Sequence, residues 1–177
     1  MIELGDVDEG LNQMRTGIDG YEAMNAWLAS CWFRSLLAKA YAGAGLPDAA
    51  LRELDSASAI GRRTGEHFYE AEIYRLQGEL TLICSKSSSV ESAEQLFIAS
   101  IELARRQSAR SFELRSAVSL ARLWQRSGKH ARAVELLLPV VRAFAEGLLT
   151  SDVSEALELA NELGAEMPGN YEWSSRV

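Results

Sequence analysis

Apolar residues recur along this chain at intervals of three and four, which is the spacing of one face of an α-helix. The pattern predicts eight helices, over residues 7–18, 21–43, 47–63, 66–84, 90–107, 110–127, 130–145 and 152–163. Ala, Leu, Glu and Arg, all good helix formers, dominate the composition, and only 3 prolines interrupt it. We therefore expect an all-α protein.

One motif occurs three times: an apolar helix face, a short break, and then Ala-x-x-x-large-x-x-small. The alanines that open its second half are Ala50, Ala93 and Ala133, spaced 43 and 40 residues apart. Small residues on the preceding helix, at Ala38, Gly78 and Ala121, would let the two helices of each copy approach closely. The bulky residues that would fill the space between copies are Tyr41, Leu54, Phe97 and Trp124. A repeat of this kind buries its apolar faces by stacking on its neighbours.

This pattern resembles the tetratricopeptide repeat (TPR), a pair of antiparallel helices with small residues at their contact. The resemblance implies a right-handed α-solenoid of helix pairs with a C-terminal capping helix. Two segments, residues 67–80 and 111–124, carry a more specific resemblance. Together with residues 128–163 they are similar to the C-terminal repeat region of large bacterial signalling proteins that carry an AAA/STAND-type ATPase module. Such proteins often add a class III adenylate/guanylate cyclase domain or a DNA-binding domain.

The repeats divide the chain into successive units. We expect a leading half-repeat over 1–20, TPR-like repeats over 21–64, 65–108 and 109–146, a capping helix over 150–164 and a tail over 165–177. The half-repeat lacks a first helix and would expose an apolar face, which indicates a fragment of a longer protein; the alternative is a natural terminal cap. Asp152 and Glu155 have the spacing of a capping box for the last helix. Tyr171 and Trp173 could tuck back onto the solenoid.

In TPR proteins the first helix of each pair lines a concave groove. The residues of this chain at those positions are Trp32, Lys39, Glu72, Arg75, Glu79, Arg115, Arg122 and Arg126. Glu72 can face Arg115, Glu79 can face Arg122, and Arg75 can pair with Glu79 one helical turn away. We interpret these charges as an ion-pair ladder between repeats, the alternative being direct bonds to a peptide. Lys39 and Arg126 have no evident mate and are better contact candidates, and Trp32 is a candidate anchor.

Charge is distributed unevenly. The whole chain has a net charge of −7, but residues 102–142 hold nine basic against three acidic residues, and residues 143–177 are acidic. A basic stretch can bind nucleic acid, yet the basic residues spread over successive helices without interleaved aromatics, which disfavours that function. Cys31 and Cys84 are expected to be buried inside helices. Neither they nor His67 and His130 form a metal site, and no cofactor is expected.

No phosphate-binding glycine loop, cyclase aspartates or nucleophile elbow occurs, so the sequence predicts a non-catalytic scaffold that binds a protein or peptide. The partner could be another domain of a parent chain that is itself an ATPase or cyclase. The alternatives are self-association as a homodimer through the exposed repeat face, and small-ligand sensing for a transcriptional regulator. No apolar run approaches the ~20 residues of a membrane span and no signal peptide is evident, so we expect a cytoplasmic protein.

Overall fold

The computed structural model describes residues 4–84, 89–144 and 150–165, and this part of the chain forms eight α-helices and no β-strand. Their bounds are α1 (Leu4–Ala23), α2 (Ser30–Gly43), α3 (Pro47–Thr64), α4 (Glu70–Cys84), α5 (Ser89–Arg106), α6 (Arg110–Arg126), α7 (His130–Arg142) and α8 (Ser151–Glu162). The prediction of an all-α protein is confirmed.

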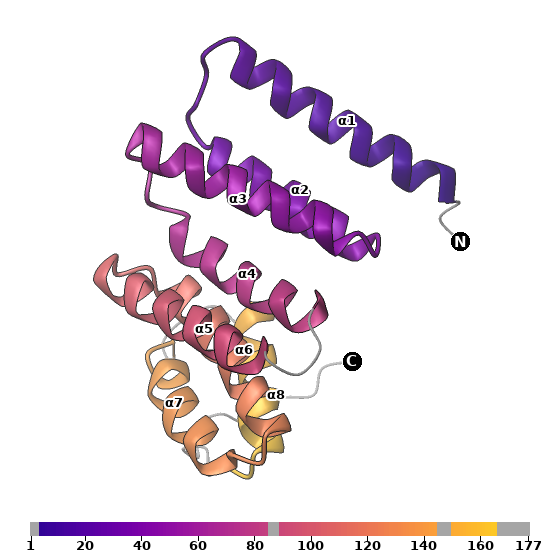
Figure 1. Cartoon of the computed structure of the whole chain (residues 1–177). Helices are drawn as coiled ribbons and strands as arrows, with labels where there is room; N and C mark the ends of the chain where they lie inside the picture. The colour runs from indigo at the N-terminus through magenta and orange to yellow at the C-terminus, as the bar shows by residue number, and fades with distance from the viewer. Residues whose placement is uncertain (1–3, 85–88, 145–149, 166–177) are drawn as a thin grey trace.

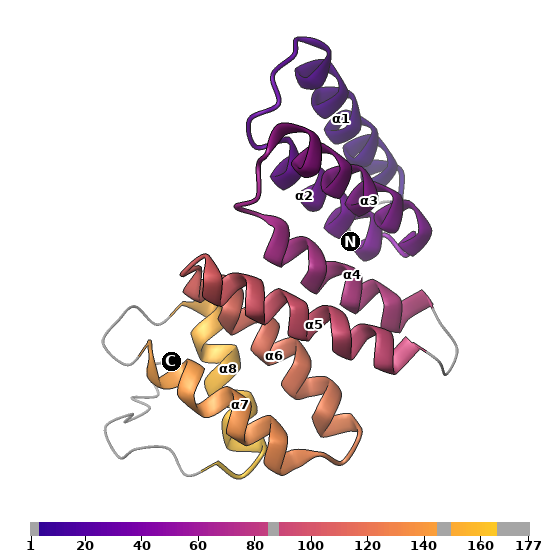
Figure 2. The same ribbon diagram turned by 60° about the vertical axis from the view of Figure 1, so that its left-hand side comes forward.

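The helices stack as antiparallel pairs along one direction (Figure 1). α2 packs against α3, α4 against α5 and α6 against α7, and the second helix of each pair also contacts the first helix of the next. α8 packs on α6 and α7, whereas α1 contacts α2 alone among the described helices. A second view shows α1 at one end of the stack and α7 and α8 at the other (Figure 2). The chain is an open α-solenoid in which α2, α4, α6 and α8 form one continuous row.

Close contact within each pair depends on small side chains. Ala50, Ala93 and Ala133, which define the repeat, are all fully buried. On α4, Gly78 lies against Phe97 of α5, and a Cβ added to Gly78 would come within 2.6 Å of the Phe97 ring. Phe97 is itself buried in a packed core, so moving its ring aside would disturb the side chains around it. The prediction that small residues stand where paired helices touch is confirmed.

The apolar core follows the stack. One cluster joins α2, α3 and α4, a larger one joins α5, α6, α7 and α8, and a small one attaches α1 to α2 through Leu11, Ile18 and Leu37. Buried hydroxyls connect neighbouring helices between these clusters. Ser100 Oγ on α5 donates to the carbonyl of Ala71 on α4 at 2.5 Å. The solenoid thus has a continuous interior whose thinnest section is the attachment of α1.

The turn between α1 and α2 differs from the prediction. The first helix runs five residues beyond its predicted end at 18, and the second begins at Ser30 instead of 21. Asn25 and Ala29 adopt positive φ angles of 57° and 63°, which interrupt the helical backbone. An alanine in this conformation gives no sequence signal, because its side chain disfavours it. The remaining helix ends differ from the prediction by at most four residues.

Two further differences from the prediction concern helix termini. Gly65, at φ 75°, ends α3 in the left-handed conformation, and α4 begins only at Glu70. The predicted capping box at Asp152 and Glu155 is wrong. Thr150 caps α8 instead, accepting a hydrogen bond from the Val153 amide at 3.4 Å. Both acidic side chains are therefore available for contacts elsewhere.

The two cysteines have different environments. Cys31 is buried as predicted, and burial together with the nearby Glu66 carboxylate raises the pKa of its thiol to about 11. Cys84 is exposed, which makes the prediction wrong there. It is the last residue of α4.

Some predicted features lie outside the described residues. They are residues 85–88 of the serine-rich stretch and the tail with Tyr171 and Trp173. Ser89, the last serine of that stretch, is buried at the start of α5. Across the described ranges, every helix falls short of the combination of length and apolarity that a bilayer-spanning segment needs.

Replacing Gly78 with valine should lower the free energy of unfolding by about 2 kcal/mol, because added carbons overpack a tight helix contact. Denaturant titration followed by circular dichroism measures this change. Gly20→Ala on α1 is the matched control, since a Cβ there meets nothing within 4 Å and the helix propensity of alanine favours the folded state. A Gly78→Val protein as stable as the parent would contradict the proposed role of this contact.

Candidate functional site

The row of first helices carries a charged groove. It has a volume of about 350 Å³ and is lined mainly by α4, α6 and α8, with one residue from α2. The lining residues are Lys39, Glu72, Arg75, Glu79, Arg115, Val118, Ser119, Arg122, Asp152 and Glu155. Six of the eight residues predicted for a concave groove are therefore brought together here.

The floor of the groove is a buried ion pair on α4. Glu72 is fully buried, and Arg75 donates to both of its carboxylate oxygens, from Nε at 2.8 Å and from Nη2 at 2.7 Å. Burial by itself would lower the pKa of Arg75, but the hydrogen bonds and charge of Glu72 outweigh it and the pKa lies above its ordinary value. Arg75 therefore stays charged and holds its neighbours in a fixed geometry.

The ion network extends from this pair to both adjacent helices. Arg75 also pairs with Glu79, whose carboxylate accepts a hydrogen bond from Ser119 of α6 at 3.0 Å. Nη1 of Arg115 on α6 lies 3.7 Å from Oε1 of Glu72, and Nε of Arg115 donates to Oδ2 of Asp152 on α8 at 2.6 Å. A continuous chain of charges thus joins three first helices across the groove.

These contacts test the predicted pairings. The pairs Glu72–Arg115 and Arg75–Glu79 are confirmed. The pair Glu79–Arg122 is wrong, because Arg122 pairs with Glu155 of α8 at 2.6 Å. The competing partner lies on the last helix, which sequence reasoning had assigned to capping alone.

Lys39 and Arg126 differ from the other groove cations. Both are exposed, and neither has an ion-pair partner within the described ranges. Each lies in an extension of the groove: Lys39 in a mainly apolar one beside Leu76 and Leu80, and Arg126 in one of mixed polarity beside the buried ring of Phe97. The two extensions meet at residues 79 and 83 of α4, which line both of them.

Trp32 does not line the charged groove or its extensions. Its ring stacks on Phe33 with centroids 5.2 Å apart, on the part of α2 that faces α1.

Sequence reasoning missed Asp152, Glu155 and Ser119 as groove residues. The charge pattern held a signal for the two acids, since an acidic final helix directly follows a basic stretch that ends with α7. Ser119 gave no such signal because serines are common throughout this chain. Within the described part of the chain, no three His, Cys, Asp or Glu side chains gather in a way that could hold a metal ion.

Comparisons with known proteins agree with this architecture. The family model described as "Tetratricopeptide repeat" matches residues 32–56 and 114–139, which cover most of α2 and the first part of α3, and most of α6 and α7. A solved structure of kinesin light chain TPR-like repeats from Podosopora anserina is similar, with a TM-score of 0.59 and 21% identity over 90% of this chain and 88% of that one. No curated protein matches the chain. The chain thus contains TPR motifs in a TPR-like α-solenoid, a fold that typically serves as a protein-interaction scaffold.

Replacing Glu72 with leucine should lower the free energy of unfolding by about 3 kcal/mol, because it leaves a buried Arg75 charge without its main partner. The double variant Glu72→Leu/Arg75→Leu should recover most of this loss, since an apolar pair needs no charge compensation. Thermal and denaturant unfolding measure both. Arg122→Ala, which breaks the more exposed pair with Glu155, is the control and should change stability by less than about 0.5 kcal/mol. A harmless Glu72→Leu substitution would show that the network is not structural.

Proposed function

We propose that this chain is a non-catalytic scaffold that binds a protein segment in the groove along α2, α4, α6 and α8. The main support for the proposal is a difference among the basic residues of the groove, some of which form ion pairs while two do not. Arg75, Arg115 and Arg122 are paired with carboxylates, whereas Lys39 and Arg126 are exposed without an ion-pair partner in the described ranges. The paired residues shape the groove, and the two unpaired cations are available to a ligand.

The apolar side chains in the two extensions of the groove indicate a further feature of the ligand. Ile83 of α4 is 64% exposed and lines both extensions, between Lys39 on one side and Arg126 on the other. A peptide with an apolar side chain flanked by carboxylates complements this arrangement, since the apolar group would cover Ile83 and the carboxylates would meet the two cations. A preformed groove limits the ordering cost to the peptide, and a few anchors would set a modest affinity.

The division into repeats over 21–64, 65–108 and 109–146 with a capping helix belongs to the same proposal. We further propose that these repeats form the binding arm of a larger cytoplasmic bacterial regulator with ATPase or nucleotide cyclase modules. The support for this context is the resemblance of residues 67–80 and 111–124 to the C-terminal repeats of such proteins.

Reversing the charges of Lys39 and Arg126 tests whether the groove binds the ligand. A peptide selected by display on the parent chain should bind Lys39→Glu/Arg126→Glu at least ~10-fold more weakly, because each reversed charge repels a ligand carboxylate. Fluorescence anisotropy with the selected peptide measures the affinity. The melting temperature should not fall, since neither side chain is buried or paired among the described residues.

The matched control is Arg52→Glu/Arg142→Glu, which makes the same change in net charge at exposed positions on α3 and α7, outside the groove. Its affinity should equal that of the parent chain. Equal binding by all three proteins would reject the groove as the binding site. Early melting of the Lys39→Glu/Arg126→Glu protein would show instead that these residues are structural.

A further inference from the structure

The last helix supplies half of the acidic side chains in the charged groove. Four basic and four acidic residues line the groove, and two of the four carboxylates, Asp152 and Glu155, belong to α8. The other two, Glu72 and Glu79, lie on α4, where both pair with Arg75. The arginines of α6 therefore depend mainly on α8 for their neutralisation.

Each of these two carboxylates binds one arginine of α6. Nε of Arg115 donates to Oδ2 of Asp152 at 2.6 Å. Nη1 of Arg122 lies 2.6 Å from Oε1 of Glu155, which among the described residues is the one carboxylate within ion-pair distance of Arg122. The second contact of Arg115, from Nη1 to Oε1 of Glu72, is longer at 3.7 Å. Removing the charges of α8 would thus leave Arg122 unpaired and Arg115 with its longer contact.

The pairs between α6 and α8 lie at the surface of the groove, unlike the ion pair on its floor. The side chains of Arg115 and Arg122 are 35% and 48% exposed, and those of their partners on α8 are 29% and 43% exposed. Arg75 on the floor is 10% exposed. Arginines in contact with water can bind a carboxylate of a ligand without the cost of burying a charge. In the folded chain, α8 occupies these two arginines first.

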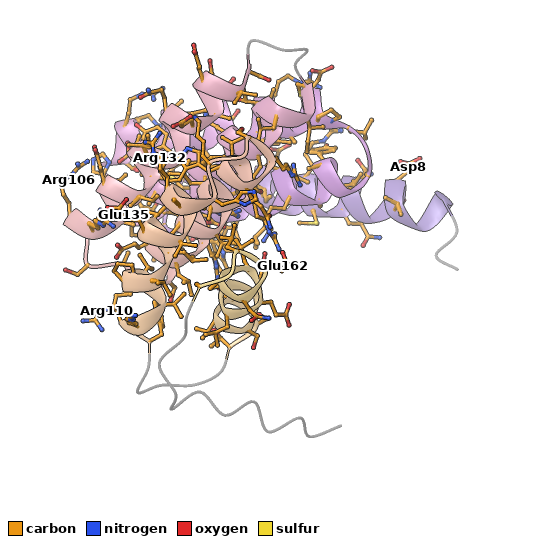
Figure 3. The ribbon with its side chains drawn as sticks, turned by 90° about the horizontal axis from the view of Figure 1, so that it is seen from below. Asp8, Arg106, Arg110, Arg132, Glu135 and Glu162 are labelled. Carbon is orange, nitrogen blue, oxygen red and sulfur yellow. The ribbon has the colours of Figure 1, made fainter. Side chains whose placement is uncertain are left out.

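Apolar packing, more than these ion pairs, holds α8 in place. Its residues Val153, Ala156, Leu157 and Ala160 are buried in the core cluster that also includes α6 and α7. Figure 3 shows the stack from this end, with α8 and its Glu162 beside α7. Exposed ion pairs contribute little to stability. The main effect of the two carboxylates is therefore on the charge of the groove.

We propose that Asp152 and Glu155 determine the charge selectivity of the groove. They keep its centre neutral by occupying the two arginines of α6, so a segment rich in carboxylates gains no partner there. The carboxylates of a ligand are left with Lys39 and Arg126 at the margins. Selection of this kind rejects the wrong partner as well as attracting the right one. The proposal rests on the proposed function, because it specifies which acidic segments the same groove excludes.

The double variant Asp152→Asn/Glu155→Gln tests this role, since it removes both charges and keeps the size of both side chains. Labelled hexaglutamate with blocked ends is titrated with the full chain at low ionic strength and followed by fluorescence anisotropy. We expect hexaglutamate to bind the variant at least ~10-fold more tightly than the parent, because two arginines become available to it. The gain should largely disappear in ~0.5 M NaCl, since these charges are exposed.

The matched control is Glu102→Gln/Glu158→Gln, which makes the same change in net charge at exposed positions on α5 and α8. Neither residue lines the groove or its extensions. This control should bind hexaglutamate like the parent chain. Circular dichroism checks that both variants fold. If the double variant melts early, Glu155→Gln alone, at the more exposed pair, should still give a gain of at least ~3-fold.

Two results would overturn the role of α8: equal affinity of the parent and the Asp152→Asn/Glu155→Gln variant for hexaglutamate, or an equal gain in the control. Either result leaves the proposed function standing as long as the peptide selected on the parent chain still depends on Lys39 and Arg126. If that peptide binds the Lys39→Glu/Arg126→Glu protein like the parent, the proposed function itself is wrong.

Discussion

The close approach of paired helices is the constraint on which this molecule depends. Where Gly78 meets Phe97, the backbone of α4 lies so near α5 that a single additional carbon has no space. On the second helices, the equivalent residues Ala50, Ala93 and Ala133 are fully excluded from solvent. Because successive pairs pack on one another, their first helices lie side by side. The charged groove is a direct consequence of that row.

Within the row of first helices, a buried ion pair stands where apolar side chains would otherwise pack. Glu72 has no contact with solvent, and its bidentate partner Arg75 is nearly as buried. Such pairs contribute little net stability, but breaking one costs much more than forming it gains, so they fix geometry. The network places the carboxylates of α4 and α8 around the arginines of α6, which neutralises the centre of the groove. Under the proposed function, specific recognition falls to the exposed cations and the apolar side chains at the margins of the groove.

Local periodicity and the repeat were enough to predict the eight helices, the buried alanines and the pairs Glu72–Arg115 and Arg75–Glu79. These features follow from spacing along one helix or from equivalence between repeats. The partner of Arg122 could not be obtained this way, because Glu155 belongs to a helix outside the repeat, whose docking depends on tertiary packing. The late start of α2 was missed because the turn before this helix uses a left-handed alanine. Backbone choices of that kind are imposed by the packed structure and leave no mark in the residue type.

The central claim is that stability comes from stacking between neighbouring helices and not from one closed core. Amide hydrogen exchange followed by mass spectrometry tests it directly, because local opening free energies report how many neighbours hold each helix. The account predicts the slowest exchange in α4, α5 and α6, which have packed helices on both sides, and the fastest in α1, which contacts α2 alone among the described helices. Equal protection of α1 and α5, with all helices opening in a single step, would contradict it.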